Sequence, residues 1–358
     1  MSNQQLGLEK LGWNKWFDEL SILQSRPIET VARVAAVDRG QLLLLNDNGP
    51  FRAKLSGNYM YSHRSAEELP CVGDWVCVEK GQDDDFGLIH ALLDRKTSLR
   101  RKAAGGSSES QMIAANVDYV IIVQSCYFDF NLNRLQRYLV MVMEGGAEPS
   151  VLLTKTDLVE PDVLNAQLSQ IHAAGVTAPV LTLSNVTREG IDELKRILLP
   201  GKTYCLVGSS GVGKSTIINE LIGRDRLETQ DVSATGEGRH TTVRRELIVL
   251  RNGALVIDNP GMREFGIIGA EDGIAGGFIV INTLASRCRY RDCTHTSEPG
   301  CAVLNALRTD EIDQAHYENY IKLKEESEFY QMSYAEKRKK DRDFGRYIKS
   351  AKKDMRRD

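Results

Sequence analysis

The 358-residue sequence has no apolar run that approaches the length of a membrane-spanning helix. Its first twenty residues mix charged with apolar positions and contain no signal-peptide core. These two absences predict a cytoplasmic protein that does not interact with membranes. The length allows two or three domains, each able to bury a core of its own.

The chain also lacks a large excess of positive or negative side chains, because 46 Lys and Arg nearly balance 49 Asp and Glu and leave a formal net charge of −3. The chain as a whole is therefore not a polycation. Basic side chains nevertheless gather in residues 94–102 and in the C-terminal segment 337–358. Such runs either contact nucleic acid or form a solvated helical surface, and charge alone favours neither interpretation.

The seven cysteines are unevenly distributed. Four lie in apolar, strand-like stretches, where a buried free thiol is expected: Cys71, Cys77, Cys126 and Cys205. The others crowd into residues 288–301 and, in a reducing compartment, indicate a metal site rather than disulfides. With one histidine they form a C-x4-C-x-H-x5-C pattern: Cys288, Cys293, His295 and Cys301. Three thiolates and an imidazole make a closed tetrahedral set, which predicts one structural Zn²⁺.

Five short strand-like stretches follow an N-terminal tail that we place at residues 1–30. They are separated by turn signals and cover residues 30–38, 41–47, 50–55, 73–79 and 87–93. Five strands in about seventy residues predict an OB-type β-barrel, which we place at residues 31–99. Such barrels often bind oligonucleotides, but they serve many other purposes as well.

A Gly/Ser-rich stretch at residues 100–111 has the composition of a linker. Beyond it, strand-like and helix-like segments alternate over residues 117–223, and residues 245–258 have the pattern of a β-hairpin. This alternation predicts a mostly parallel sheet covered on both faces, which we place at residues 112–270. A zinc-binding domain with a helix over residues 311–330 and the basic tail would occupy residues 271–358.

One stretch matches the phosphate-loop pattern G-x-x-x-x-G-K-[ST] in full, between a predicted strand and a predicted helix. Backbone N–H groups of such a loop surround the phosphates of a nucleoside triphosphate. Lys214 is expected to reach the β- and γ-phosphates and to act in catalysis, and Ser215 to ligate Mg²⁺. The predicted phosphate-site residues are Gly208, Ser209, Ser210, Gly211, Val212, Gly213, Lys214, Ser215 and Thr216.

Asp258 ends the predicted strand 254–258, where a carboxylate can hold the Mg²⁺ through water. Gly261 allows a backbone N–H to approach the γ-phosphate. A threonine from the glycine-rich stretch between Ser215 and Asp258 is expected to close over the Mg²⁺ and the γ-phosphate. Both Thr241 and Thr242 are candidates for that role.

A base-reading motif, T-K-x-D, ends the predicted strand that precedes the phosphate loop by some fifty residues. Asp157 can accept two hydrogen bonds from the N1–H and 2-amino groups of guanine, a pair that adenine does not offer. Lys155 can lay its methylene stem along the base. Ser184 and Asn185, after the next strand, could place backbone groups near guanine O6. Thr154 begins the motif, and the predicted ligand is GTP or GDP.

The base reader comes before the phosphate loop, the reverse of the order in ordinary GTP-binding proteins. A parallel sheet fixes a site by where its strands end in space, and chain termini can be relocated when the original ends lie close together. The sequence therefore predicts a circularly permuted P-loop GTPase domain between an OB-type barrel and a zinc-binding helical domain.

The order of the T-K-x-D, phosphate-loop, H-T-T and D-x-P-G motifs, with the Cys/His cluster after them, resembles the circularly permuted GTPases of the RsgA (YjeQ) family over about residues 30–320. The resemblance implies zinc binding and GTP hydrolysis stimulated by the small ribosomal subunit during its late maturation. It implies the subunit and its rRNA as partners, and it links His240 to the stimulated hydrolysis. We expect a monomer.

Two positions depart from the family pattern. Thr154 replaces the usual asparagine, so the amide that buttresses the site and contacts the base is missing. Asn259 replaces the threonine of D-T-P-G, at a position that need not touch the nucleotide. Met262 directly follows Gly261, in the region where Ras-like enzymes carry a glutamine that orients the attacking water. We therefore expect slow intrinsic hydrolysis, with His240 ordered by a partner.

Two other classes of protein compete with a GTPase. A metabolic enzyme such as a kinase would need a pocket for an acceptor substrate, and no segment suggests one. An RNA-binding protein with an OB barrel, a zinc site and a weak or regulatory nucleotide site would show negligible turnover. The intact Lys214, Ser215 and Asp258 favour the GTPase.

Overall fold

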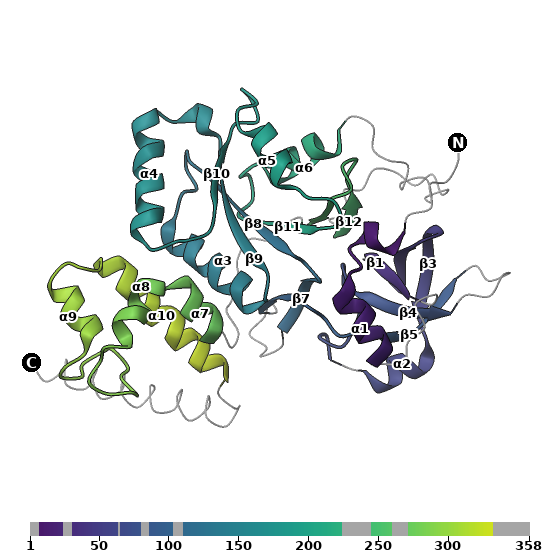
Figure 1. Ribbon diagram of the computed structural model, residues 1–358, viewed down its shortest axis with the longest axis horizontal. Coiled ribbons are helices and arrows are strands. Elements are labelled where there is room, and N and C mark those ends of the chain that lie inside the picture. The colour runs from purple at the N-terminus through teal and green to yellow at the C-terminus, as the bar shows by residue number, and fades with distance from the viewer. Residues whose placement is uncertain are drawn as a thin grey trace, which may run out of the picture.

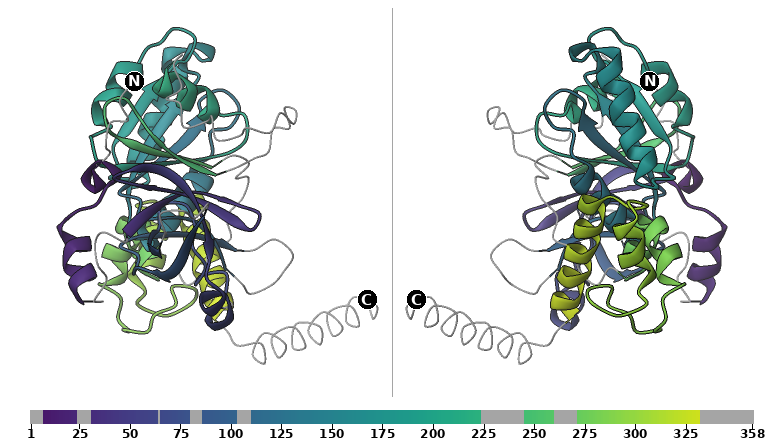
Figure 2. Two further views of the ribbon diagram at one scale, coloured as in Figure 1. Left: turned by 90° about the vertical axis from the view of Figure 1, so that its right-hand side faces the viewer. Right: turned by 90° about the vertical axis from the view of Figure 1, so that its left-hand side faces the viewer.

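The computed structural model describes residues 7–23, 31–63, 65–79, 86–102, 110–223, 245–259 and 271–331. A β-barrel and a group of C-terminal helices lie on opposite sides of Figure 1, with an α/β domain between and above them. The α/β domain also forms the upper part of the molecule in both side views (Figure 2). Within the described ranges, no helix combines the length and the apolar character needed to cross a bilayer.

The barrel is closed by five strands in the order β1-β2-β3-β5-β4-β1. Its neighbours pair antiparallel except β3 and β5, which are parallel. Small and branched side chains fill the interior, among them Ala32, Val34 and Ile89. This confirms the predicted OB-type barrel. Its elements are β1 (Val31–Asp38), β2 (Gln41–Asn46), β3 (Gly49–Leu55), α2 (Gly57–Ser62), β4 (Trp75–Glu79) and β5 (Gly87–Leu92).

The described part of the expected N-terminal tail is folded against the barrel. It contains the short helices η1 (Leu8–Leu11) and α1 (Lys15–Leu23). Trp13 is 5% exposed and meets Trp75 edge-on, with ring centroids 4.9 Å apart, while Phe17 packs beside both rings. These aromatic side chains extend the hydrophobic core, so the segment around Trp13 belongs to the folded structure.

The expected linker at residues 100–111 begins and ends in strands. β6 (Ser98–Lys102) and β7 (Ser110–Ala115) form a separate two-stranded antiparallel sheet. Leu99 and Ile113 are fully buried in the core that this two-stranded sheet shares with the α/β domain. Residues 103–109 lie outside the described residues.

The α/β domain is built on five parallel strands in the order β10-β9-β8-β11-β13. The last of them forms the predicted antiparallel hairpin with β12. The strands are β8 (Tyr119–Ser125), β9 (Glu148–Thr154), β10 (Val180–Leu183), β11 (Thr203–Val207), β12 (Glu246–Val249) and β13 (Leu255–Asp258).

Helices cover both faces of this sheet, as predicted. Leu135 and Leu139 of α3 and Ile171 of α4 pack in the core on one face. Leu194 of α5 and Ile217 of α6, each 1% exposed, pack together in the core on the other face. The helices are α3 (Leu132–Glu144), η3 (Thr156–Leu158), α4 (Pro161–Ala173), α5 (Ile191–Ile197) and α6 (Lys214–Ile222).

The barrel and the α/β domain share one continuous sheet of eleven strands. The link is the pairing of β12 with β1, where Ala36 lies opposite Glu246. β12 therefore has a barrel strand on one side and β13 on the other.

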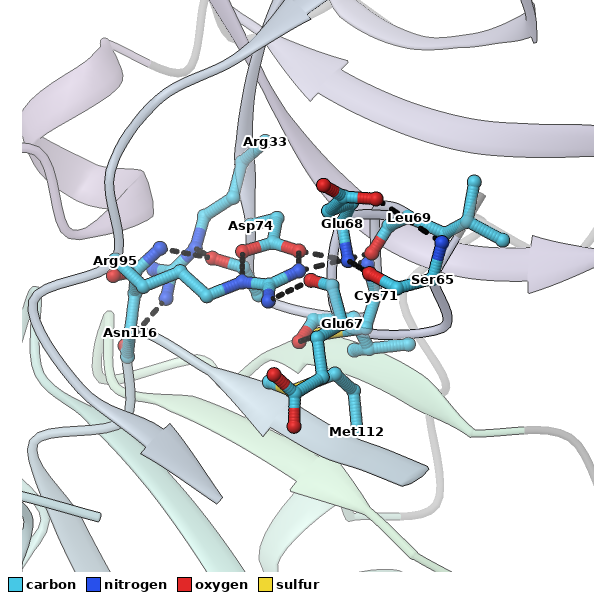
Figure 3. A network of polar contacts seen from close by, with 12 residues as sticks. Arg33, Ser65, Glu67, Glu68, Leu69, Cys71, Asp74, Arg95, Met112 and Asn116 are labelled. Carbon is cyan, nitrogen blue, oxygen red and sulfur yellow. Dashed lines mark hydrogen bonds and ion pairs between the residues drawn. The ribbon is translucent and has the colours of Figure 1, made fainter. Parts of the chain in front are cut away.

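A buried ion pair lies where the barrel leads into the α/β domain (Figure 3). Arg95 donates from Nε and Nη2 to the two carboxylate oxygens of Asp74, each at 2.8 Å. The same guanidinium donates to the backbone carbonyls of Glu67 and Leu69. The Asp74 side chain is fully buried and that of Arg95 is 14% exposed, so this pair is held away from water.

Arg33 completes the junction from β1 (Figure 3). Its Nε donates to the Gly73 carbonyl at 3.2 Å, and its Nη2 donates to the Asn116 carbonyl at 2.9 Å. It also donates to the carbonyl of Leu11. Burial lowers the pKa of Arg33 to about 10. One arginine thus ties the N-terminal segment, the barrel and the start of the α/β domain together.

Four helices form the C-terminal part of the described chain and pack on α3. Gln136 of α3 contacts His316 and Asn319, and Arg137 pairs with Glu326 at 2.9 Å. Val140 of α3 lies within their apolar core. The helices are α7 (Glu271–Gly277), α8 (Ile279–Ala285), α9 (Ala302–Arg308) and α10 (Gln314–Gln331). α10 confirms the helix that was predicted over residues 311–330.

The four cysteines that were expected to be free and buried are both: Cys71, Cys77, Cys126 and Cys205. Cys205 accepts a hydrogen bond of 2.9 Å from the Asn259 amide. Asn259 is 1% exposed, so this side chain points into the sheet at the position where the sequence departs from D-T-P-G.

Candidate nucleotide and metal sites

The order of the strands decides which loops meet. β8 lies between β9 and β11 and runs parallel to both (Figure 1). The carboxyl ends of parallel strands share one edge of a sheet, and the loops that follow them form ligand sites there. The base-reading motif after β9 and the phosphate loop after β11 therefore lie on one edge, with residues 126–131 between them. The reversed order of the motifs along the chain does not separate them.

The phosphate loop starts very close to β8. Gly208 has φ of 147°, and a Cβ atom there would lie 2.2 Å from the Val123 carbonyl oxygen, so a side chain does not fit. Gly213 caps α6, which begins at Lys214. The free N–H groups of the first helical turn therefore face the loop. Ser215 and Thr216 are exposed in that turn.

Lys214 folds back onto its own loop. Its Nζ donates to the carbonyls of Gly208 and Ser209 at 2.7 and 2.6 Å. Burial lowers the pKa of Lys214, while the carboxylates of Asp258 and Asp129 act in the opposite direction. The ammonium is therefore held by carbonyls of its own loop, and the two carboxylates favour its charged form.

Asp258 stands at the end of β13, next to the strand that leads into the phosphate loop. Burial raises the pKa of its carboxyl, Lys214 opposes that rise, and Glu246 adds to it. The carboxylate and the ammonium of Lys214 are thus close enough to influence each other. This is the arrangement expected for a carboxylate that faces a phosphate-bound cation.

The base-reading loop is held by Ser184. Its hydroxyl donates to Asp157 Oδ1 at 2.5 Å and accepts the N–H groups of Val186 and Thr187. Ser184 is fully buried, whereas Asp157 is exposed and its second oxygen can meet a ligand. The amide of Asn185 lies 3.2 Å from the position of a Cβ on Gly213, so this residue touches the phosphate loop.

Thr154 joins the two halves of the site. It is fully buried, and its hydroxyl donates to the Val212 carbonyl at 2.6 Å. It also lies 3.2 Å from the Gln124 carbonyl. The shorter bond crosses from the end of β9 to the phosphate loop. The absence of the usual asparagine amide was expected to leave the site without a support at this position. The Thr154 hydroxyl supplies one, through its bond to the phosphate loop.

Two aromatic residues that carry no sequence motif lie at the site. Tyr138 of α3 is 2% exposed and interacts with the Ser209 side chain, and burial raises its pKa to about 12. Phe128, in the loop after β8, lies against the base-site lysine, with Lys155 Nζ 4.6 Å from the ring centroid. Neither was predicted, because their spacing from the motifs gives no sign of contact.

Four predicted site residues lie outside the described residues. They are His240, Thr241, Thr242 and Gly261. The remaining nucleotide-site residues lie in the phosphate loop and the base-reading loops, at the ends of β9 and β13, or in the first turn of α6.

The Cys/His cluster is assembled in the C-terminal part. The ligand atoms of Cys288, Cys293, His295 and Cys301 all lie within 4.8 Å of one another. The Cys288 and Cys301 sulfurs are 3.9 Å apart, and each is 3.5 Å from His295 Nδ1. Tetrahedral zinc with bonds of about 2.3 Å to sulfur and about 2.0 Å to nitrogen separates such atoms by about 3.8 and 3.5 Å. The donor set therefore fits a zinc ion.

The surroundings of the cluster hold its ligands in place. Backbone N–H groups of Ala302 and Leu304 donate to the sulfurs of Cys288 and Cys301 at 3.3 and 3.4 Å. The Tyr317 hydroxyl of α10 donates to the His295 carbonyl at 2.8 Å. Such contacts orient metal ligands, and they connect the cluster to the helix that packs on α3.

Known proteins are similar to this chain in both sequence and fold. The model of the family described as RsgA GTPase matches residues 92–268. A Listeria monocytogenes protein named small ribosomal subunit biogenesis GTPase RsgA 2 is 41% identical over 324 residues, 90% of each chain. The chain belongs to the RsgA GTPase family. An RsgA protein of Opitutus terrae is 40% identical over 334 residues, again 90% of each chain.

Two solved structures have a similar fold. The crystal structure of YjeQ from Thermotoga maritima superposes with a TM-score of 0.61 at 26% identity, covering 82% of this chain and 96% of that one. The structure of YloQ, described as a circularly permuted GTPase, shares the fold with a TM-score of 0.60 at 24% identity, covering 85% and 96%. As an RsgA GTPase, the chain is a GTP hydrolase, and guanine nucleotide with Mg²⁺ is its implied ligand set.

Proposed function

We propose that this GTPase binds the small ribosomal subunit and its rRNA and hydrolyses GTP during late maturation of the subunit. The curated relatives carry the name small ribosomal subunit biogenesis GTPase and are similar along nine tenths of the chain. The main structural support for the nucleotide site is the hydrogen bond from Thr154 to Val212, which holds the base-reading loop against the phosphate loop.

In this proposal the two loops divide the nucleotide between them. Asp157 accepts the N1–H and 2-amino groups of guanine, Lys155 lies along the base, and Ser184 and Asn185 border O6. Residues 208–216 surround the phosphates. Ser215 and Asp258 hold the Mg²⁺ together with Thr241 or Thr242, and Gly261 meets the γ-phosphate. The Cys/His cluster holds one structural Zn²⁺, with Cys288, Cys293, His295 and Cys301 as its ligands.

Hydrolysis requires a water molecule placed in line with the γ-phosphate. Lys214 stabilises the charge that develops on the phosphate oxygens. Met262 cannot orient the water by a hydrogen bond, so intrinsic turnover is slow, and His240 supplies the missing contact once the subunit is bound. The enzyme acts as a cytoplasmic monomer.

The test measures phosphate release from GTP, with ATP as control, in the presence and absence of purified small ribosomal subunits. We expect the subunit to stimulate turnover of GTP alone. His240→Ala should abolish the stimulation and leave GDP affinity unchanged. Turnover that the subunit does not change would remove the ribosome from the proposal and leave the GTPase. Negligible turnover under all conditions would instead favour an RNA-binding protein with a regulatory nucleotide site.

A further inference from the structure

The loop after β8 lies between the two halves of the nucleotide site and is anchored at both ends. At its start, the Cys126 N–H donates to the Thr154 carbonyl at 2.9 Å, and Gln167 donates to the Cys126 carbonyl at 2.8 Å. At its end, the side chain of Gln124 exchanges two hydrogen bonds with the backbone of Asn131. The loop is therefore a fixed part of the edge that carries the site.

Two aromatic rings project from this anchored loop. Tyr127 is 61% exposed and Phe128 is 65% exposed, and their rings meet edge-on with centroids 5.8 Å apart. Phe130, two positions later, packs against the core. Rings as exposed as these contribute little to folding through burial. The position of Phe128 therefore needs another explanation.

The reason lies in its contact with Lys155. Lys155 Nζ stands 4.6 Å from the centroid of the Phe128 ring, within the range of a cation–π interaction. Lys155 also has φ of 59°, a conformation that is uncommon outside glycine and that fixes the direction in which its side chain leaves the backbone. Both the backbone and the far end of this side chain are thus held.

We propose that Phe128 is a positioning residue for the guanine site. It holds the ammonium of Lys155 so that the methylene stem stays in place to cover one face of the base. The ring acts through the lysine and does not itself touch the base. This inference rests on the proposed role of Lys155 in base binding.

The experiment measures GDP affinity for variants of the full chain. Phe128→Ala and Phe128→Leu should each weaken GDP binding about two- to fivefold, as expected from a cation–π contact at an exposed site. Phe128→Trp, which keeps an aromatic face, should retain the affinity of the unchanged protein. Tyr61→Ala removes an exposed ring in α2 of the barrel and serves as the control, with no change expected.

A second background separates a role through Lys155 from a general effect on the loop. Lys155→Met keeps an unbranched stem and removes the ammonium, so Phe128→Ala should have no further effect on GDP affinity in that background. An equal loss in both backgrounds would overturn the inference, and so would an unchanged affinity of Phe128→Ala alone. Failure of the guanine site itself would be recognised separately, as equal affinity of the unchanged protein for GDP and ADP.

Discussion

The hydroxyl of Thr154 donates a 2.6 Å hydrogen bond to the carbonyl of Val212, 58 residues further along the chain. The bond joins the motif that reads the base to the loop that surrounds the phosphates. Both partners are fully buried. The two segments follow different strands, β9 and β11, so the bond crosses the edge of the sheet from a side chain to a backbone carbonyl.

Removal of the Thr154 hydroxyl should weaken nucleotide binding. Thr154→Val keeps the branched shape and leaves the Val212 carbonyl without this donor, which costs about 1–3 kcal/mol for a buried group. We expect GDP affinity to fall about tenfold, which corresponds to about 1.4 kcal/mol. Titration calorimetry with GDP checks this. Thr154→Ser should retain most of the affinity, and Thr156→Val in the neighbouring η3 should retain all of it.

Asp157→Asn should change the preferred base. The amide keeps one acceptor and presents a donor where guanine needs the second acceptor, so GDP affinity should fall about 100-fold. Xanthine carries a carbonyl in place of the 2-amino group, and xanthosine diphosphate should bind the variant better than GDP does. Competition binding with the two nucleotides measures the change. A variant that still prefers GDP would show that Asp157 does not read the base.

Much of the fold could be predicted because the signals were local. The phosphate loop, the barrel strands and the alternation of strands with helices each follow from patterns within a few neighbouring residues. The N-terminal segment was expected to be a tail because nine residues of α1 give little helical signal on their own. Its structure depends on contact between Trp13 and Trp75, which lie far apart in the sequence.

In the nucleotide site, the motif residues could be predicted, but the contacts between them could not. Ser184 and Thr154 were placed near the base from their motifs, but their hydrogen bonds to Asp157 and Val212 depend on how loops from different strands approach. Phe128 was missed because an aromatic residue after an apolar strand has the pattern of a core residue. Its exposure distinguishes it, and exposure is a property of the folded chain.

Metal removal should affect the C-terminal helices selectively. We expect one zinc per chain by elemental analysis, and loss of the ion on treatment with a strong chelator or in Cys293→Ser. Hydrogen exchange should then rise in α8, α9 and α10, whose core includes Cys293 and Cys301. Cys71→Ala, in a separate cluster, should keep one zinc. Unchanged exchange in these helices after complete removal of the metal would contradict a structural role.

The ion pair between Arg95 and Asp74 should contribute strongly to stability. Arg95→Ala leaves a buried carboxylate without its partner, and we expect the free energy of unfolding to fall by about 3–5 kcal/mol. The matched control is Arg100→Ala. Arg100 lies 3.7 Å from Glu67 in a partly exposed pair, so its loss should cost less than about 1 kcal/mol. Urea unfolding followed by tryptophan fluorescence compares them, and equal losses would show that burial of the pair is unimportant.

Acidification should weaken the contact between α3 and α10 through His316. Asn319 donates to Gln136 Oε1 at 2.7 Å, so Gln136 Nε2 is the donor toward His316 Nδ1 at 2.6 Å, and that nitrogen accepts as part of a neutral imidazole. Burial lowers the pKa of His316, and Asp313 opposes the shift. A histidine with a folded-state pKa below its unfolded value contributes stability above the unfolded pKa, and this stability is lost as the pH falls.

Hydrogen exchange in α10 between pH 7 and pH 5 tests this dependence, with the intrinsic effect of pH on exchange taken into account. Protection should decrease below about pH 6.5, where an unperturbed histidine begins to take up a proton. His316→Gln cannot be protonated in this range, so protection of α10 should depend less on pH in the variant. The difference between the two proteins removes the contributions of groups they share, such as Glu326 and Arg137. Parallel pH profiles would show that protonation of His316 does not control this contact.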